Sequence, residues 1–153
     1  MPTLDQLRKI SLFQDLSDDE LKKVIKIVKK QTFRKGAVIW DEGDPEQGLH
    51  IIMSGKVRIS RRTKEGDKQV LSVLNKNNFI GELSLLDGRN HSASAEALKK
   101  SEILIIKKAD MDKFLEKNPK IAYKIIRDLA IEISQIVRSM NDKFIKMVDY
   151  LWN

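Results

Sequence analysis

The segment from Phe79 to Ala93, FIGELSLLDGRNHSA, contains the residues best suited to bind a small charged ligand. Gly81 permits a tight backbone entry, and residues 82–86 are predicted to form one helical turn. The first N–H groups of such a turn lack partners and carry the positive end of the peptide dipoles, so they favour an anion. The Glu82 carboxylate would repel a phosphate but would accept a hydrogen bond from a ribose hydroxyl. With a basic side chain from the following loop, the segment predicts a ligand that carries both phosphate and sugar.

No catalytic or metal-binding set of residues is found elsewhere in the chain. There is no cysteine, which excludes disulfides and thiolate metal ligands, and the only histidines are His50 and His91. The stretch GDPEQGLH at 43–50 has the two glycines of a phosphate-binding loop. However, Leu49 and His50 stand where that loop needs Lys and Ser or Thr, so we expect only a turn. We therefore expect no enzyme activity, no metal and no cofactor.

The length and charge of the chain fit one basic domain. It has 153 residues, a net charge of +7 and a pI near 9.5. Such a charge attracts anions, including nucleotides, nucleic acid and acidic lipid. The densest lysine block, residues 22–30, alternates with apolar residues at helical spacing, which favours a solvated helix face over a nucleic-acid patch. No apolar run is long enough for a signal peptide or a membrane span, so we expect a cytoplasmic protein.

Two changes of hydrophobic period divide the chain. Residues 1–30 are predicted to be helical, with Ser17 as an N-cap and Glu20 completing its capping box. Residues 31–108 change to a period of two, which is typical of strands. We expect strands within four segments separated by turn-forming residues: 37–44, 49–63, 68–74 and 101–108. This spacing predicts an antiparallel sandwich or small barrel that can hold one small ligand.

Residues 109–153 return to a helical period. Asp110 is the expected cap of a short helix that ends near Lys117, and Pro119 fits the first turn of a much longer helix. The long helix has an apolar stripe with heptad-like spacing that shifts after Met140. Its members are Ile126, Leu129, Ile133, Ile136, Met140, Phe144, Met147 and Leu151. We favour a homodimer paired through residues 120–150, and the alternative is a helix satisfied by its own domain.

Several of these motifs resemble the cyclic nucleotide-binding domain family, which includes the catabolite activator protein and kinase regulatory subunits. The family's phosphate-binding cassette has an F-G-E motif, then L-[AS]-L and, after a short loop, an arginine followed by small residues. The matching residues here are Phe79, Gly81, Glu82, Leu83, Ser84 and Leu85, then Ser92, Ala93 and Ser94. LFQDLSDDEL at 12–21 is similar to the family's helical entry, and the segment from Phe33 to Ile59 is similar to its first strands.

The resemblance implies an α+β fold: an eight-stranded antiparallel, jelly-roll-like β-roll with N-terminal helices and a long C-terminal helix. One domain would span 1–153, with the roll at 31–108. The implied ligand is cyclic AMP or cyclic GMP. The predicted ligand-binding residues are Gly81, Glu82, Leu83, Ser84, Arg89, His91, Ser92 and Ala93.

One position departs from the family pattern. The family places its phosphate-binding arginine ten residues after the cassette glycine, and that position is His91. Neutral imidazole has no charge and lacks the forked donors of guanidinium. Three interpretations stay open. The first is weak binding of cyclic AMP or cyclic GMP through backbone amides, Glu82 and Ser92, with or without Arg89. The second is binding of another small anion at lower pH, and the third is a roll that binds nothing and serves as a dimerisation or docking scaffold.

The predicted function is a non-catalytic sensor or regulatory domain that signals by repositioning its C-terminal helix, as the resemblance implies. The chain ends at Asn153, so we expect no helix-turn-helix domain within it and little direct DNA binding. It would contact a downstream protein partner or be a fragment of a longer regulator. The segment Tyr150 to Trp152 is either a docking tail or a core plug. A nucleic-acid-binding module that uses the positive charge directly is the rival hypothesis.

Overall fold

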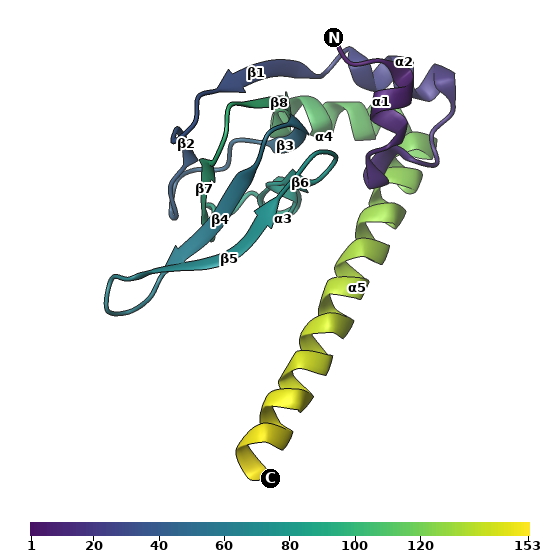
Figure 1. The fold of residues 1–153 in the computed structure, drawn as a ribbon. Coiled ribbons are helices and arrows are strands. Elements are labelled where there is room, and N and C mark those ends of the chain that lie inside the picture. Colours follow the sequence, from purple (N-terminus) through teal and green to yellow (C-terminus); the bar gives the residue numbers. More distant parts are fainter.

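The computed structural model describes all residues 1–153, and its strands form two antiparallel sheets of four strands each (Figure 1). The strands are β1 (Lys29–Phe33), β2 (Val38–Trp40), β3 (Leu49–Ser54), β4 (Val57–Arg62), β5 (Lys68–Leu74), β6 (Phe79–Ile80), β7 (Ser94–Ala97) and β8 (Ser101–Ile106). The helices are α1 (Leu4–Arg8), the 3₁₀-helix η1 (Ser11–Phe13), α2 (Asp18–Ile25), α3 (Glu82–Asp87), α4 (Lys108–Lys117) and α5 (Pro119–Trp152).

The predicted eight-stranded antiparallel roll with flanking helices is confirmed. The strand orders are β1-β8-β3-β6 in one sheet and β2-β7-β4-β5 in the other. Strands that lie far apart in the chain are therefore neighbours, as where β1 pairs with β8. At the other edge of the same sheet, β6 pairs with β3 and leads directly into α3, which lies beside β6 at the mouth between the sheets (Figure 1).

The alternation of side chains along β3 and β8 explains why both strands are apolar on both faces. Leu49 and Ile51 belong to the larger core, which the helices form against the first sheet, whereas Ile52 belongs to the smaller core inside the roll. On β8, Leu104 faces the helical core and Ile103 faces the roll interior. Because successive side chains of a strand point to opposite faces, a strand between two cores needs apolar residues throughout.

The local helix signals were partly right. Ser17 is the N-cap of α2, and its side chain and that of Glu20 form the predicted capping box. Pro119 occupies the first turn of α5 as predicted. The prediction that the helical zone continues to about Lys30 was wrong, because Lys29–Phe33 forms β1. Its sequence, KKQTF, has no strong period, and its pairing with β8 decides its conformation.

Two further expectations needed correction. The cap of α4 is Lys107, not Asp110, so Asp110 lies inside the first turn, where a carboxylate also complements the helix dipole. Two short strands, β6 and β7, were not predicted. They have two and four residues, too few for a pattern with a period of two to be read from the sequence.

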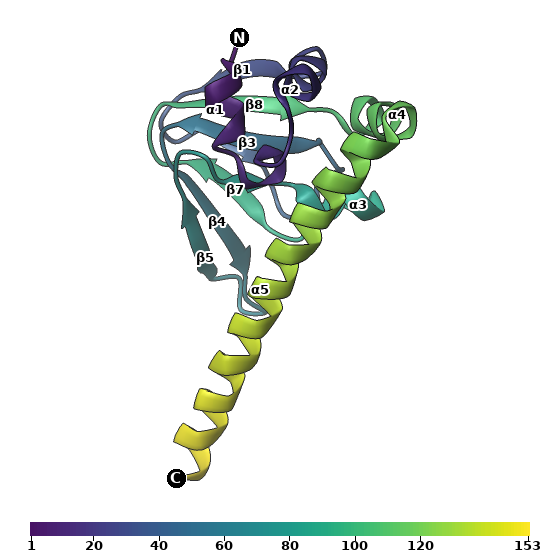
Figure 2. The ribbon, with the colours of Figure 1, turned by 90° about the vertical axis from the view of Figure 1, so that its right-hand side faces the viewer.

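Helix α5 packs on the body only along its first part and then projects away from it (Figure 2). Its buried residues are Ile121, Ile125, Asp128 and Leu129. From Ser134 to Asn153 every residue is exposed except the half-buried Val148. The prediction that the tail could be a core plug was therefore wrong for this conformation, because Tyr150 and Trp152 are 85% and 83% exposed.

The entry into α3 depends on a glycine. Gly81 has a φ of +88°, the left-handed region that side chains disfavour. A Cβ at Gly81 would also collide with the carbonyl oxygen of Gly48, which is backbone and cannot rotate away. Gly66, in the turn before β5, has the same φ of +88°, but a Cβ added there would have no other atom within 4 Å.

We expect Gly81→Ala to destabilise the protein more than Gly66→Ala. Both substitutions incur the left-handed penalty of about 1–2 kcal/mol, and only Gly81→Ala adds a steric cost of about 1–3 kcal/mol. The unfolding free energy of each variant in guanidinium chloride measures the difference. Equal losses of unfolding free energy in the two variants would show that the backbone at Gly48 shifts to accommodate the added Cβ without a free-energy cost.

Candidate functional site

Helix α3 places unpaired backbone N–H groups at the mouth of the roll. Its first bond runs from the Leu85 N–H to the Gly81 carbonyl at 2.9 Å. The N–H groups of residues 82–84 precede that bond and lack an intrahelical acceptor. Buried Leu85 anchors α3 to the helical core. The prediction that residues 82–86 form a single helical turn is confirmed, since α3 spans Glu82–Asp87.

A small cavity lies beside the start of α3. Its volume is about 200 Å³. The lining residues come from β2, β4, β5, β6, α3 and the loop that follows it: Trp40, Ile59, Leu71, Ile80, Gly81, Glu82, Leu83, Ser84, His91, Ser92 and Ala93. No lysine or arginine is among them. We call this space the cassette cavity.

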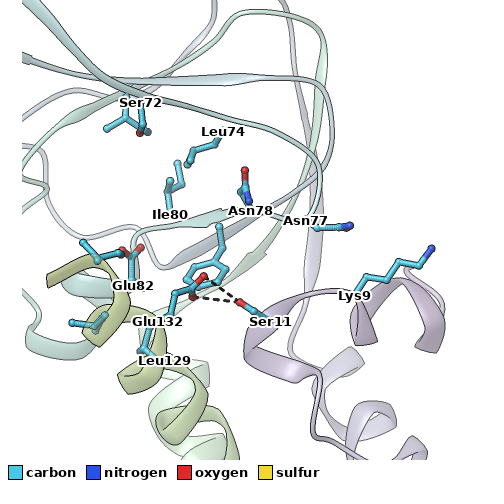
Figure 3. A pocket seen from close by; sticks show the side chains of 14 residues that line it. Lys9, Ser11, Ser72, Leu74, Asn77, Asn78, Ile80, Glu82, Leu129 and Glu132 are labelled. Atoms are coloured by element: carbon cyan, nitrogen blue, oxygen red, sulfur yellow. Dashed lines mark hydrogen bonds between the residues drawn. The ribbon is translucent and has the colours of Figure 1, made fainter. Parts of the chain in front are cut away.

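A larger cavity of about 530 Å³ adjoins it and reaches α5 (Figure 3). Glu82 lines both cavities, and Leu129, Glu132, Ile133 and Ile136 of α5 line only the larger one. The Ser11 hydroxyl donates to the Glu132 carboxylate at 3.3 Å and 3.4 Å from its two oxygens. We call this space the helix cavity. It is rich in hydrogen-bond acceptors and has one lysine, the exposed Lys9, at its edge.

The Glu82 side chain lies where the two cavities meet, because it lines both of them. Burial raises the pKa of its carboxyl, the N–H of the same residue lowers it, and the negative charge of Glu132 raises it further. A carboxylate in this position is poorly solvated. A hydroxyl group that donates to it would replace the missing water and favour its charged form.

His91 is held tightly by its backbone and by its ring. Its N–H donates to the Asp44 carbonyl at 2.9 Å, and its carbonyl accepts from the Gly43 N–H at 2.8 Å. The ring stacks on Trp40, with centroids 3.7 Å apart and planes 3° from parallel. Nδ1 lies 3.4 Å from the Ser84 hydroxyl, whereas Nε2 is buried and has no partner. Burial lowers the pKa of His91, and the charge of Asp44 opposes this.

Most of the predicted ligand-binding residues meet at the cassette cavity. Gly81, Glu82, Leu83, Ser84, His91, Ser92 and Ala93 line it. Arg89 does not: its side chain is 86% exposed, and its Nε lies 3.9 Å from the Asp87 carboxylate. The hypothesis that Arg89 swings into the site requires a loop arrangement different from the one seen here.

Trp40, Ser11 and Glu132 also shape the site and were not predicted as site residues from the sequence. Trp40 is 4% exposed and donates from Nε1 to the Ala93 carbonyl at 2.9 Å, so it ties β2 to the loop after α3. Ser11 and Glu132 approach the helix cavity from η1 and α5. A tryptophan in a strand signals only a core residue. The partnership of residues 11 and 132 arises from packing of distant segments, which no local pattern reveals.

No group of three or more His, Asp or Glu side chains is placed to hold a metal ion. None of the helices combines the length and apolar character that a membrane span requires.

The two-sheet roll, the short helix at its mouth and the long C-terminal helix define an antiparallel β-roll domain with cavities beside α3. The model of the cyclic nucleotide-binding domain matches residues 30–118, more than half of the chain. The chain belongs to this family, as its cassette motif predicted.

Individual relatives agree with this assignment. The cyclic AMP receptor protein of Thermus thermophilus is 31% identical over 119 residues, which cover 78% of this chain and 55% of that protein. A CRP-like cAMP-activated global transcriptional regulator of Mycobacterium tuberculosis is 25% identical over 136 residues, which cover 89% of this chain and 61% of that protein. The chain thus spans little more than half the length of these two regulators.

A solved structure supports the same fold. The N-terminal domain of a transcriptional regulator from Streptomyces coelicolor superposes with a TM-score of 0.79 at 29% identity. The superposition covers 89% of this chain and 95% of that domain.

The second histidine, His50, gives a pH-dependent prediction. It lies in the roll interior, 2% exposed, and its Nδ1 is 3.1 Å from the Gly48 carbonyl. Burial lowers its pKa from 6.5 to about 4. Between pH 6.5 and about 4, His50 therefore binds a proton in the unfolded chain but not in the folded protein. The resulting stability is complete above pH 6.5 and is lost as the pH falls towards 4.

We expect the unfolding free energy to fall more steeply between pH 6.5 and 5 in the wild type than in His50→Leu. The difference is about 1.4 kcal/mol per pH unit, since one proton is involved. Denaturant titrations at several pH values measure it. Identical slopes would show that His50 protonates freely in the folded state.

Proposed function

We propose that this chain is a non-catalytic sensor domain that binds a cyclic nucleotide, cyclic AMP or cyclic GMP, across the two cavities. The phosphate lies in the cassette cavity near the α3 N–H groups, the ribose lies on Glu82, and the base lies in the helix cavity against α5. The cytoplasmic location expected from the sequence stays a prediction.

The observation that carries this proposal is the position of Glu82 on the walls of both cavities. A ligand that fills only one cavity would leave this carboxylate poorly solvated. A ribose between the cavities donates hydroxyl hydrogens to the carboxylate and directs the phosphate and the base to opposite sides. The N–H groups of residues 82–84 then meet the phosphate.

The helix cavity suits a purine. Its apolar wall includes Leu129 and Ile133, which accommodate a flat ring, and Glu132 supplies an acceptor at one side. Both adenine and guanine carry an exocyclic amino group that can donate to a carboxylate. Ser11 already donates to Glu132, which keeps that carboxylate partly hydrogen-bonded before a ligand arrives.

The output of the domain is a change in the position of α5. This helix contributes part of the helix cavity, so a bound base touches it directly. A ligand shifts a conformational equilibrium only through different contacts in the two states. Contacts from the base to Leu129, Glu132 and Ile133 meet that requirement, and the projecting half of α5 would transmit the change to a downstream partner.

The projecting half of α5 also supports a homodimer. Its exposed apolar side chains after Ser134 are Ile136, Val137, Met140, Phe144, Ile145, Met147, Leu151 and Trp152. A single helix cannot cover such a stripe, and a second copy of the same helix can.

A scaffold that binds no nucleotide is the second candidate. Two residues support it. His91 occupies the position of the family's arginine, and burial lowers its pKa, so it carries no charge at pH 7. Arg89 points to solvent. In that case the roll would only position α5 for dimerisation.

The first experiment is calorimetric titration with cyclic AMP and cyclic GMP. We expect binding to the wild type and a loss of about 10- to 100-fold in Glu82→Gln, because the amide gives a weaker acceptor for the ribose hydroxyl. Glu65→Gln is the matched control, since Glu65 is exposed in the turn before β5.

Three results discriminate the candidates. Equal affinities of Glu82→Gln and the wild type would show that the ribose does not bind to Glu82. No heat from the wild type, together with binding by His91→Arg, would support the scaffold. Strongly salt-dependent binding of random duplex DNA would support the nucleic-acid-binding rival.

The second experiment tests the dimer by sedimentation equilibrium. We expect the wild type to be a dimer and the double variant Met140→Glu, Phe144→Glu to be a monomer, because burying two carboxylates in the seam is unfavourable. Arg138→Glu, about half a turn from Met140 on the helix, changes the net charge by the same amount and should stay dimeric. A dimeric double variant would place the interface elsewhere.

A further inference from the structure

In the proposed function, two negative charges meet in the cassette cavity and no cation is assigned to balance them. Glu82 brings a negative charge to its wall, and a phosphate would bring another. No lysine or arginine lines the cavity, and Arg89 points to solvent beside Asp87. His91 is the one lining residue that can become a cation. Its side chain is more than nine-tenths buried, and Nε2 has no hydrogen-bond partner in the protein.

The contact between His91 and Trp40 places the imidazole ring over the face of the indole. Their centroids are 3.7 Å apart and their planes are parallel within 3°. Stacked carbon atoms approach to about 3.5 Å, so the imidazole lies over the indole face with a lateral offset of about 1 Å. Neutral rings can stack with such an offset. A cation in the same position is attracted further by the negative face of the indole.

His50 provides an internal comparison, because it contacts the same tryptophan. The rings of Trp40 and His50 are 89° apart in a T-shaped contact, with centroids separated by 4.8 Å. This is an arrangement that neutral rings favour. Trp40 thus contacts one histidine as a neutral partner, and it offers the other a surface suited to a positive charge.

We propose that Trp40 and His91 together form a proton-dependent anion site, in which His91 takes up a proton when a phosphate monoanion binds and Trp40 stabilises the resulting imidazolium. The proposal rests on the proposed function and specifies how the phosphate is held. Nε2–H donates to a phosphate oxygen, Nδ1–H donates to the Ser84 hydroxyl, and the indole face lies against the ring. Trp40 is a positioning residue, since it acts through His91.

The surrounding charges are compatible with this proton uptake. Asp44, on the turn that holds the backbone of His91, favours the imidazolium. Glu82 lines the same cavity as His91. His50, on the other side of Trp40, stays neutral because burial lowers its pKa to about 4. Without ligand, burial lowers the pKa of His91 below its ordinary value, so His91 is largely neutral at pH 7.

The test measures proton uptake by titrating the full chain with cyclic AMP and cyclic GMP in PIPES and imidazole buffers, whose ionisation enthalpies differ. Near pH 7 we expect the uptake of nearly one proton for each ligand bound. The affinity should rise by up to about tenfold per pH unit as the pH falls from 8 to 6. His91→Arg should bind at pH 8 as tightly as at pH 6, because guanidinium is always charged.

Variants of Trp40 separate positioning from packing. Trp40→Phe retains an aromatic face and should retain a pH-dependent affinity, whereas Trp40→Leu should lose affinity at pH 6 and change little at pH 8. A purely structural role would lower the affinity equally at both pH values. NMR titration of the His91 ring in the wild type, with and without nucleotide, tests the proton uptake independently of these variants, since we expect the pKa of His91 to rise on binding. If Trp40→Leu does not fold, this titration and Trp40→Phe remain as tests.

Each outcome decides between the two proposals. Binding with no proton uptake and with constant affinity from pH 8 to 6 would overturn the role of His91 and leave the sensor function intact. Absence of binding by the wild type at pH 6, with binding by His91→Arg, would also overturn it, because a protonated imidazole should suffice there. If neither protein binds either nucleotide, the proposed function fails and this inference fails with it.

Discussion

The packing of Trp40 between two histidines is the contact on which the site depends. It connects β2 to the loop after α3 through the bond from Nε1 to the Ala93 carbonyl, and it forms one wall of the cassette cavity. The two bonds between His91 and the turn at residues 43–44 close the same unit from the other side. The cassette is therefore fixed by contacts to β2 and the turn after it, which are remote in the chain.

The position of the helix cavity next to α5 reduces the packing of this helix against the roll. A cavity between the roll and the helix cannot contribute apolar packing, so α5 is held mainly by its first part, where Ile121, Ile125 and Leu129 enter the helical core. Glu132 then meets Ser11 across the cavity by hydrogen bonds instead of close packing. The first turns of α5 are held firmly by the core and the following turns are held loosely. The position of these following turns can therefore change when a ligand fills the cavity between α5 and the roll.

The sequence predicted those features that are encoded by neighbouring residues. The capping box at Ser17, the proline at the start of α5 and the glycine-led turn at Gly81 are each specified within a few positions, and the structure confirms them. It could not predict β1, since KKQTF acquires its conformation from β8. Nor could it predict Trp40 or Glu132 in the site, because their positions result from the closure of the roll and the path of α5.

The replacement of arginine by histidine changes what kind of sensor such a roll can be. Guanidinium is charged at every physiological pH, so a site built on it responds to ligand concentration alone. In the proposed site, the imidazole is neutral without ligand and gains a proton as the phosphate arrives, so occupancy depends on two concentrations. The aromatic surface of Trp40 and the nearby Asp44 lower the free-energy cost of that proton, whereas burial raises it. The balance of these opposing effects sets the pH at which the site becomes effective.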